Sequence, residues 1–271
     1  MLKRRNIERF MKKTNILYIP LIICFISFSF TGDKSNKIKN DLSEFNLKGK
    51  VKILTEIEYK ISPNIGKIKE GDMLYKYIYS FNETGNIIET NSYDPEGNLD
   101  GKYVYTYDNN KGNKTEMISY NPDGSSDEKC TYNYDSKGNM IKEIWYNSEG
   151  GISKQYGYKY DDKGNKIAMN RYDSRDSLIC KDSYKYDDNG KKIEWNHYNL
   201  SPPTDGSLSK KVIIKYDEKG NINVQNIYLA DGNFECYSYK YEYKKKGNWK
   251  KETIYKNGQP QYITERNIKY Y

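Results

Sequence analysis

Residues 155–172 read QYGYKYDDKGNKIAMNRY, and this stretch decides the fold. Tyr156, Tyr158 and Tyr160 alternate with small or charged residues, which is the period of two that marks a half-buried β-strand. The run Asp-Asp-Lys-Gly-Asn at 161–165 then breaks the alternation with residues that accept positive φ or bond their own backbone. A second strand follows over 166–172, so the stretch predicts a β-hairpin.

The same pattern recurs along most of the chain. Seven first-turn glycines follow one another at intervals of 26 to 30 residues, and a tyrosine stands eight residues after each of them. The glycines are Gly85, Gly112, Gly138, Gly164, Gly190, Gly220 and Gly247, and the tyrosines are Tyr93, Tyr120, Tyr146, Tyr172, Tyr198, Tyr228 and Tyr255. So regular a spacing indicates equivalent, stacked units. We expect an all-β fold, an antiparallel β-meander of about seven Tyr-rich hairpin repeats forming a twisted, curling sheet, with partial closure on itself left open. One further strand is expected over residues 51–59.

The N-terminal 30 residues have the features of a signal peptide. Six Lys and Arg residues precede an apolar stretch, 16–30, which is shorter than the roughly 20 residues of a membrane span. An uncleaved anchor is the alternative, and Leu21-Ile22-Ile23-Cys24 resembles a bacterial lipobox, which makes Cys24 a lipidation candidate. We therefore expect export to the periplasm, the outer membrane surface or the medium. Residues 31–45 are expected to be a linker, and 46–271 the repeat domain.

The charge of the chain argues against nucleic acid as a partner. The formal net charge is +8, and residues 1–29 account for +5 of it, with six basic residues and one acidic residue. The remaining +3 is small for a protein that must neutralise many phosphates. Contact with a membrane is expected only through the N-terminal segment.

Few residues are available to hold a metal or cofactor. The chain has one histidine, His197, and no CxxC spacing, so we predict no zinc site and no cofactor. The turn carboxylates Asp161, Asp187 and Asp217 are expected to bond their own turns and not calcium.

Three cysteines remain beyond the N-terminal segment, Cys130, Cys180 and Cys236. Their odd number leaves at least one thiol unpaired. Burial as small apolar side chains is the expectation, with a disulfide left open.

The turn sequence Tyr-Asp-x-x-Gly-Asn resembles the YD repeat of RHS-type proteins. It stands here as Tyr134-Asp135 with Gly138-Asn139, as Tyr160-Asp161 with Gly164-Asn165, and as Tyr216-Asp217 with Gly220-Asn221. The resemblance covers roughly residues 75–260 and implies a short, stand-alone, exported repeat protein of a bacterial envelope. Some members of that family encapsulate a toxin, but this chain has too few repeats to enclose a cargo.

One column of the repeat supplies candidate binding residues. The position seven after the first-turn glycine is Ser92, Ser119, Trp145, Arg171, His197, Ile227 and Ile254. Neighbouring repeats in register would place Trp145, Arg171 and His197 in one row about 10 Å apart, with Trp195 on the same side. On an exposed sheet face these residues could stack a sugar ring and bind its hydroxyls. The alternative is that Trp145 packs under a neighbouring strand and the other two are surface residues.

The carboxylates sit mostly in the repeated turns, so they indicate no catalytic site and we predict that the chain is not an enzyme. The predicted function is that of a non-catalytic envelope protein that binds a glycan or a protein partner through its β-sheet surface. A structural spacer without a ligand of its own is the alternative. The loop 201–205, which lengthens one turn, is the other departure from the repeat.

Overall fold

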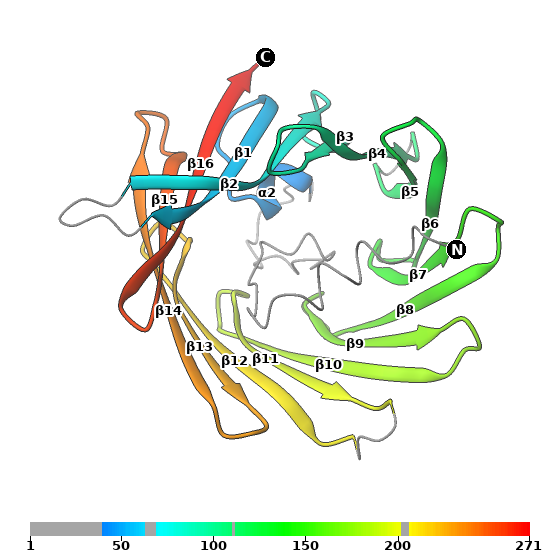
Figure 1. Cartoon of the computed structure of the whole chain (residues 1–271). Helices are drawn as coiled ribbons and strands as arrows, with labels where there is room; N and C mark the ends of the chain where they lie inside the picture. Colours follow the sequence, from blue (N-terminus) through cyan, green and yellow to red (C-terminus); the bar gives the residue numbers. More distant parts are fainter. Residues whose placement is uncertain (1–39, 63–68, 110–111, 202–205) are drawn as a thin grey trace.

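The chain forms a closed antiparallel β-barrel (Figure 1). The computed structural model describes residues 40–62, 69–109, 112–201 and 206–271. The predicted signal peptide, Cys24 and residues 202–205 of the predicted loop lie outside them. The described elements are the helix α2 (Asp41–Glu44) and the strands β1 (Val51–Ser62), β2 (Lys69–Phe81), β3 (Ile87–Tyr93), β4 (Leu99–Tyr107), β5 (Lys114–Tyr120), β6 (Ser126–Tyr134), β7 (Met140–Tyr146), β8 (Ile152–Tyr160), β9 (Lys166–Asp173), β10 (Leu178–Tyr186), β11 (Lys192–Asn199), β12 (Leu208–Tyr216), β13 (Ile222–Leu229), β14 (Phe234–Tyr243), β15 (Trp249–Lys256) and β16 (Gln259–Tyr270).

The prediction of an all-β antiparallel fold is confirmed, but the prediction of a curling sheet is wrong because the barrel closes completely. β1 pairs with β2 on one side and with β16 on the other, from Val51 opposite Tyr270 to Lys60 opposite Tyr262. An open sheet of this size would twist and would leave two edges of unpaired backbone groups, and closure pairs both. The predicted hairpins lie within β2 to β15, but the count differs from the prediction of about seven units, because β1 and β16 also pair in the closed ring of 16 strands.

Each first turn is stabilised by the residues of the repeat motif. In the turn between β8 and β9, the amide of Gly164 donates to the carbonyl of Asp161, and Gly164 adopts a φ of +79°. The carboxylate of Asp161 accepts hydrogen bonds from the amides of Lys163 and Asn165 and from the Asn165 side chain. The turn carboxylates therefore bond locally, as predicted.

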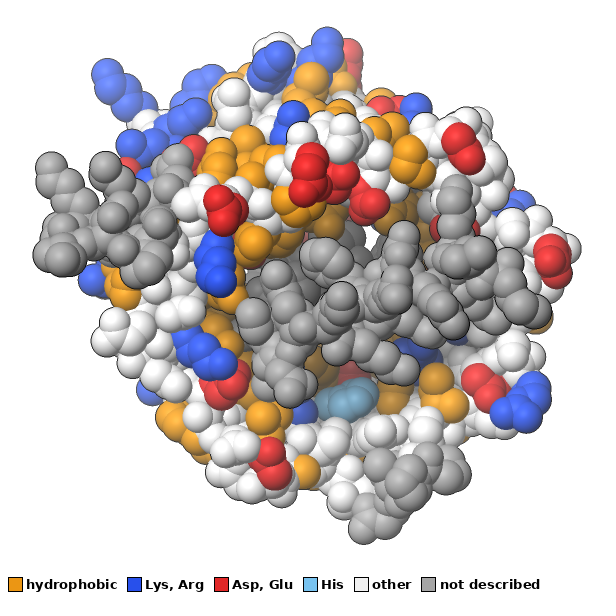
Figure 2. All heavy atoms as spheres, in the orientation of Figure 1, with side chains coloured by type: hydrophobic (Ala, Val, Ile, Leu, Met, Phe, Trp, Pro, Cys, Tyr) orange, Lys and Arg blue, Asp and Glu red, His pale blue; other side chains and the backbone are white. Residues whose placement is uncertain are grey.

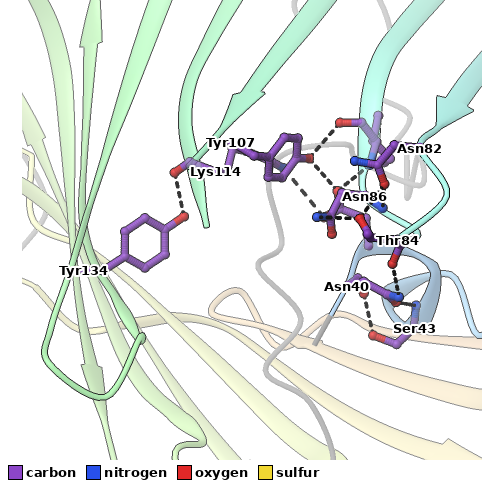
Figure 3. Close-up of polar contacts among 10 residues, drawn as sticks. Asn40, Ser43, Asn82, Thr84, Asn86, Tyr107, Lys114 and Tyr134 are labelled. Atoms are coloured by element: carbon purple, nitrogen blue, oxygen red, sulfur yellow. Dashed lines mark hydrogen bonds and ion pairs between the residues drawn. The ribbon is translucent and has the colours of Figure 1, made fainter. Parts of the chain in front are cut away.

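The tyrosine of the motif joins each hairpin to the preceding one. The ladder between β7 and β8 ends where Lys142 faces Gly157, although β8 continues to Tyr160. The Tyr160 hydroxyl donates to the carbonyl of Met140 at 2.7 Å, which replaces the missing ladder bond. Figure 3 shows the same contact between Tyr134 and Lys114. Equivalent bonds run from Tyr107 to Ile87, from Tyr186 to Lys166 and from Tyr216 to Lys192. In the last hairpin the bond to Ile222 comes from Tyr241, two residues before the motif tyrosine.

Replacing Tyr160 with Phe tests this joint. The change leaves the Met140 carbonyl without its donor, and we expect a loss of about 1–2 kcal/mol in the free energy of unfolding. Tyr146→Phe, on the outer face of β7, is the matched control and should change stability by less than half as much. Urea unfolding of both variants measures the difference, and equal losses would contradict a joining role for the Tyr160 hydroxyl.

The helix α2 identifies the inner face of the wall, because it lies inside the ring of strands (Figure 1). Phe45, just after α2, packs on Tyr79 with ring centroids 4.9 Å apart, and its carbonyl accepts from Arg266. Side chains that are directly opposite in a ladder share a face. Tyr79 points inward, and following the facing residues from Tyr79 strand by strand therefore shows which side chains of every strand point inward.

The segment 40–48 lies across one end of the barrel, at the first turns. The amide of Leu42 donates to the carbonyl of Gly85, the side chain of Asn46 donates to the carbonyl of Lys219, and the amide of Lys48 donates to Asn248. Asn40 also bonds Thr84 and Ser43 (Figure 3). Residues 41–44 of the predicted linker thus form a helix that packs against the barrel.

Candidate functional site

The predicted row of binding residues lies on the inner wall of the barrel. Trp145 in β7 faces Cys130 and Lys154, Arg171 in β9 faces Tyr156 and Cys180, and both belong to the inward set. His197 in β11 faces Asp182 and Lys210, and Trp195 points to the same side. The structure therefore brings the four predicted residues to one face, but this face lines the lumen because the sheet is closed.

Trp145 is not open to a ligand. Only 5% of it is exposed, and it packs in a cluster with Met117, Cys130 and Tyr132. Its Nε1 donates to Glu143 at 3.3 Å, and the Lys154 ammonium lies 4.2 Å from the ring centroid. The alternative considered above, packing within the wall, holds for this residue.

Trp195 is half-buried and has a free donor. Its ring lies 6.3 Å from the His197 ring, and the Lys210 ammonium lies 5.1 Å from its centroid. Its Nε1 and the Nε of Arg171 are enclosed, yet neither has a hydrogen-bond partner among the described residues. Buried donors without partners are rare, and because both atoms are closed to solvent, an acceptor would reach them only after neighbouring side chains move.

His197 is held by a carboxylate that the sequence analysis missed. Its Nδ1 lies 2.6 Å from Asp182 Oδ1, and Tyr184 donates to the other oxygen at 3.3 Å. Asp182 is buried, whereas 31% of the His197 side chain is exposed. The contact thus holds the His197 imidazole on the inner wall. A signal was available, because Asp182 stands eight residues before its first-turn glycine, where three other repeats have a tyrosine, namely Tyr77, Tyr156 and Tyr239.

Two buried lysines lie towards the first-turn end of the same wall. Burial lowers the pKa of Lys166 to about 7 and that of Lys192 to about 8, although Glu143 and Asp182 respectively oppose the shift. The Lys166 ammonium lies 4.0 Å from the Tyr158 ring centroid and has no hydrogen-bond partner among the described residues.

The opposite wall is acidic and closed. Glu56, Glu58 and Glu252 are each less than 5% exposed, and Arg266 lies between them, with its Nε 2.7 Å from Glu56. Tyr75 donates to Glu58 at 2.7 Å, while one oxygen of Glu252 has no partner within the part of the chain that the structure describes. Burial and the neighbouring carboxylates raise the pKa of both Glu58 and Glu252 to about 7. The side chains of this cluster are buried within the wall.

The cysteines are free thiols, as expected. Cys130 and Cys180 are buried and Cys236 is half-buried. Burial raises the pKa of the Cys130 and Cys180 thiols.

In the described ranges, no three His, Cys, Asp or Glu side chains are grouped so that they could hold a metal ion. Nor does that part of the chain contain a helix with the length and apolar character to span a membrane.

Comparison with known proteins yields a likeness of fold. No protein-family model and no curated protein matches the chain. A porin-like protein from Bacteroides uniformis ATCC 8492 is similar with a TM-score of 0.54 at 8% sequence identity, over 81% of this chain and 96% of that chain. This likeness extends to the fold alone.

Two further solved structures are less similar. A porin-like protein from Bacteroides vulgatus ATCC 8482 has a TM-score of 0.31 at 14% identity, over 83% of this chain and 99% of that chain. The structure of TcdB2-TccC3-TEV has a TM-score of 0.33 at 16% identity, over 78% of this chain and 11% of that one. Likenesses this low say nothing about function.

Proposed function

We propose that the chain is a non-catalytic, exported binding protein of a bacterial envelope, and that its lumen holds a saccharide. The observation that carries the proposal is Trp195, a half-buried indole on the inner wall whose Nε1 has no described partner. Arg171 and His197 lie on the neighbouring inward positions. The YD-like repeat supports the assignment to the envelope by resemblance.

The chemistry of sugars fits this wall. A pyranose ring has an apolar face that can stack on an indole such as Trp195, and its hydroxyls can bond the polar side chains beside it, Arg171 and His197. Binding sites of this kind combine aromatic contact area with a few placed polar groups. A folded protein partner could not use these residues, because they face the inside of the barrel.

The charged side chains on the outer face of the barrel support the proposal that this face is exposed to solvent. Cross-strand ion pairs lie on it, such as Lys102 with Glu89 at 2.8 Å and Lys185 with Glu194 at 2.9 Å. Figure 2 shows basic and acidic side chains around the circumference. The lipid-facing band of a membrane-spanning barrel is apolar over about 25 Å, so we propose that these strands do not contact lipid.

One observation favours binding of an envelope protein as a second candidate function. On the outer face Leu208 is 40%, Tyr228 45% and Phe234 50% exposed, and the last two rings lie 5.2 Å apart. A groove of about 420 Å³ lies beside them, lined by Leu208, Lys211 and Ile213 among others. Exposed apolar groups at this density are typical of interaction surfaces.

Titration of the mature protein with a panel of neutral and acidic oligosaccharides tests the proposal. We expect binding of at least one of them, and a loss of roughly tenfold or more in Trp195→Ala, since the stacking surface and its donor are removed. Tyr198→Ala, on the outer face of the same strand, is the matched control and should bind as the wild type does. Isothermal calorimetry gives both affinities.

Two results would contradict the proposal that the lumen binds a saccharide. Binding that is unchanged in Trp195→Ala would exclude the lumen site. No binding across the panel would favour the structural spacer.

A further inference from the structure

The inner wall formed by β8 to β12 carries far more cations than carboxylates. Its inward basic residues are Lys154, Lys166, Arg171, Lys192 and Lys210, with His197 in addition. The inward carboxylates are Asp182 and Asp173, and the latter is engaged by the amides of its own turn. Asp182 already serves His197 and Tyr184, so the wall has little negative charge left to offer.

Several of these cations lack a counter-ion. Lys154 lies 3.5 Å from Glu128, but no described carboxylate lies within 4 Å of Lys166, Arg171 or Lys210. Arg171 Nε and Lys166 Nζ also lack hydrogen-bond partners among the described residues. Burial lowers the pKa of Lys210 as well, because desolvation outweighs the attraction of its neighbours. A cation in such a place gains from any anion that reaches it.

Three of the basic groups lie on inward positions of nearby strands, although the Arg171 guanidinium lies 6.0 Å from the ring centroid of Tyr156 on β8. His197 faces Asp182 on β10 and Lys210 on β12, while Arg171 faces Cys180, the next inward position on β10. Neighbouring strands are about 5 Å apart, so Arg171 on β9 and Lys210 on β12 are roughly 15 Å apart, a span that their two long side chains can cover only together. Trp195 lies beside them, with its ring near both His197 and Lys210.

The geometry points to an acidic saccharide as the ligand, with its carboxylate bound by Arg171, His197 and Lys210 and its ring stacked on Trp195. This inference rests on the proposed function and specifies the ligand class. The acidic group belongs on this wall and not on the opposite one, where Glu56, Glu58 and Glu252 share a single buried arginine. A neutral sugar would leave the cations of β9 and β12 without partners, at the usual cost of buried unpaired charge.

The test compares each acid with its own methyl ester. Oligomers of galacturonate, glucuronate and mannuronate are titrated into the mature protein, each beside the same oligomer with its carboxylates esterified. We expect an acid to bind roughly tenfold or more tightly than its ester, since charge-assisted hydrogen bonds are lost. The preference should shrink at high salt, because ions screen the attraction.

Variants locate the site. Arg171→Gln should remove most of the preference for the acid and leave affinity for the ester nearly unchanged. Arg175→Gln is the matched control, because its side chain is 86% exposed in the turn that follows β9. Circular dichroism confirms that both variants fold, and the ratio of acid to ester affinity is unaffected by any general loss of stability.

Each outcome decides a different claim. Equal affinity for acid and ester, or a preference that survives Arg171→Gln, overturns the acidic ligand but leaves saccharide binding intact. Binding of neutral oligosaccharides alone does the same. Failure of every acid, ester and neutral oligomer to bind removes both the inference and the proposed function.

Discussion

Replacing Arg266 with Met is expected to lower the free energy of unfolding by about 3–5 kcal/mol. The Arg266 side chain is 5% exposed and that of its partner Glu56 is 3% exposed, so the change leaves a buried carboxylate without a counter-ion. Glu58 and Glu252 are close by, and both disfavour a second uncompensated charge. The guanidinium also covers Trp249 at 3.5 Å, and that contact is lost as well.

Two further variants identify the cause. Lys102→Met removes the cation of an ion pair on the outer face, where the side chains of Lys102 and Glu89 are 40% and 34% exposed, and should cost less than about 1 kcal/mol. Adding Glu56→Gln to Arg266→Met should recover part of the loss, because the orphaned charge is removed. Urea unfolding measures all three. A loss in Arg266→Met no greater than that in Lys102→Met would show that the buried pair does not hold the closure.

The barrel is expected to be more stable at pH 5 than at pH 7.5. The pKa of Glu58 and that of Glu252 rise from 4.5 to about 7 on folding, so the folded state holds these protons where the unfolded state has released them. Stability is therefore full below about pH 4.5 and falls as the pH rises through 7. Each shift corresponds to at most about 3 kcal/mol.

The other groups with shifted pKa values do not reverse the expected fall in stability between pH 5 and pH 7.5. The pKa of Glu194 is lowered to about 2 by its hydrogen bonds to Asn196 and Lys185. Its stabilising contribution is therefore lost only in more acidic solution. Lys166, whose pKa is lowered to about 7 by burial, adds a constant penalty below that pH, and the decline of this penalty above pH 7 offsets part of the loss from the carboxyls. The raised pKa of Glu143 changes stability in the same direction as Glu58 does.

Unfolding at a series of pH values measures the slope. Glu252→Gln should flatten it in part, because the amide cannot ionise and still accepts hydrogen bonds, while the other buried carboxyls keep the remaining slope. Glu149→Gln, in an exposed turn, should leave it unchanged. A stability that rises between pH 5 and 7 would contradict the assignment of these buried acids.

The hairpins could be predicted because each is specified by residues that are close together in the sequence. Asp161, Gly164 and Asn165 specify their turn through bonds to one another, and Tyr160 sits at a fixed place beside them. Closure could not be predicted in this way, since Val51 meets Tyr270 across nearly the whole chain. No local pattern marks that pairing, and the strand β16 has no first-turn glycine.

The candidate site was half predictable for a related reason. Alternation shows that Trp145 and Tyr146 point to opposite faces, but both faces carry aromatic rings, so the sequence does not say which one is inside. The difference between Trp145 and Trp195 depends on neighbours from other strands. Lys154 and Glu143 cover Trp145, whereas Trp195 keeps its donor free.

The tyrosine joint has a consequence for how such barrels change in size. Because the Tyr160 hydroxyl reaches only the preceding hairpin, the joint is the same however many units stand before or after it. Duplication or loss of one 26-residue unit would preserve every joint and leave β1 to meet β16 as before. Barrel diameter grows with strand number. The gain or loss of one hairpin therefore changes the diameter of such a barrel by the increment of two strands.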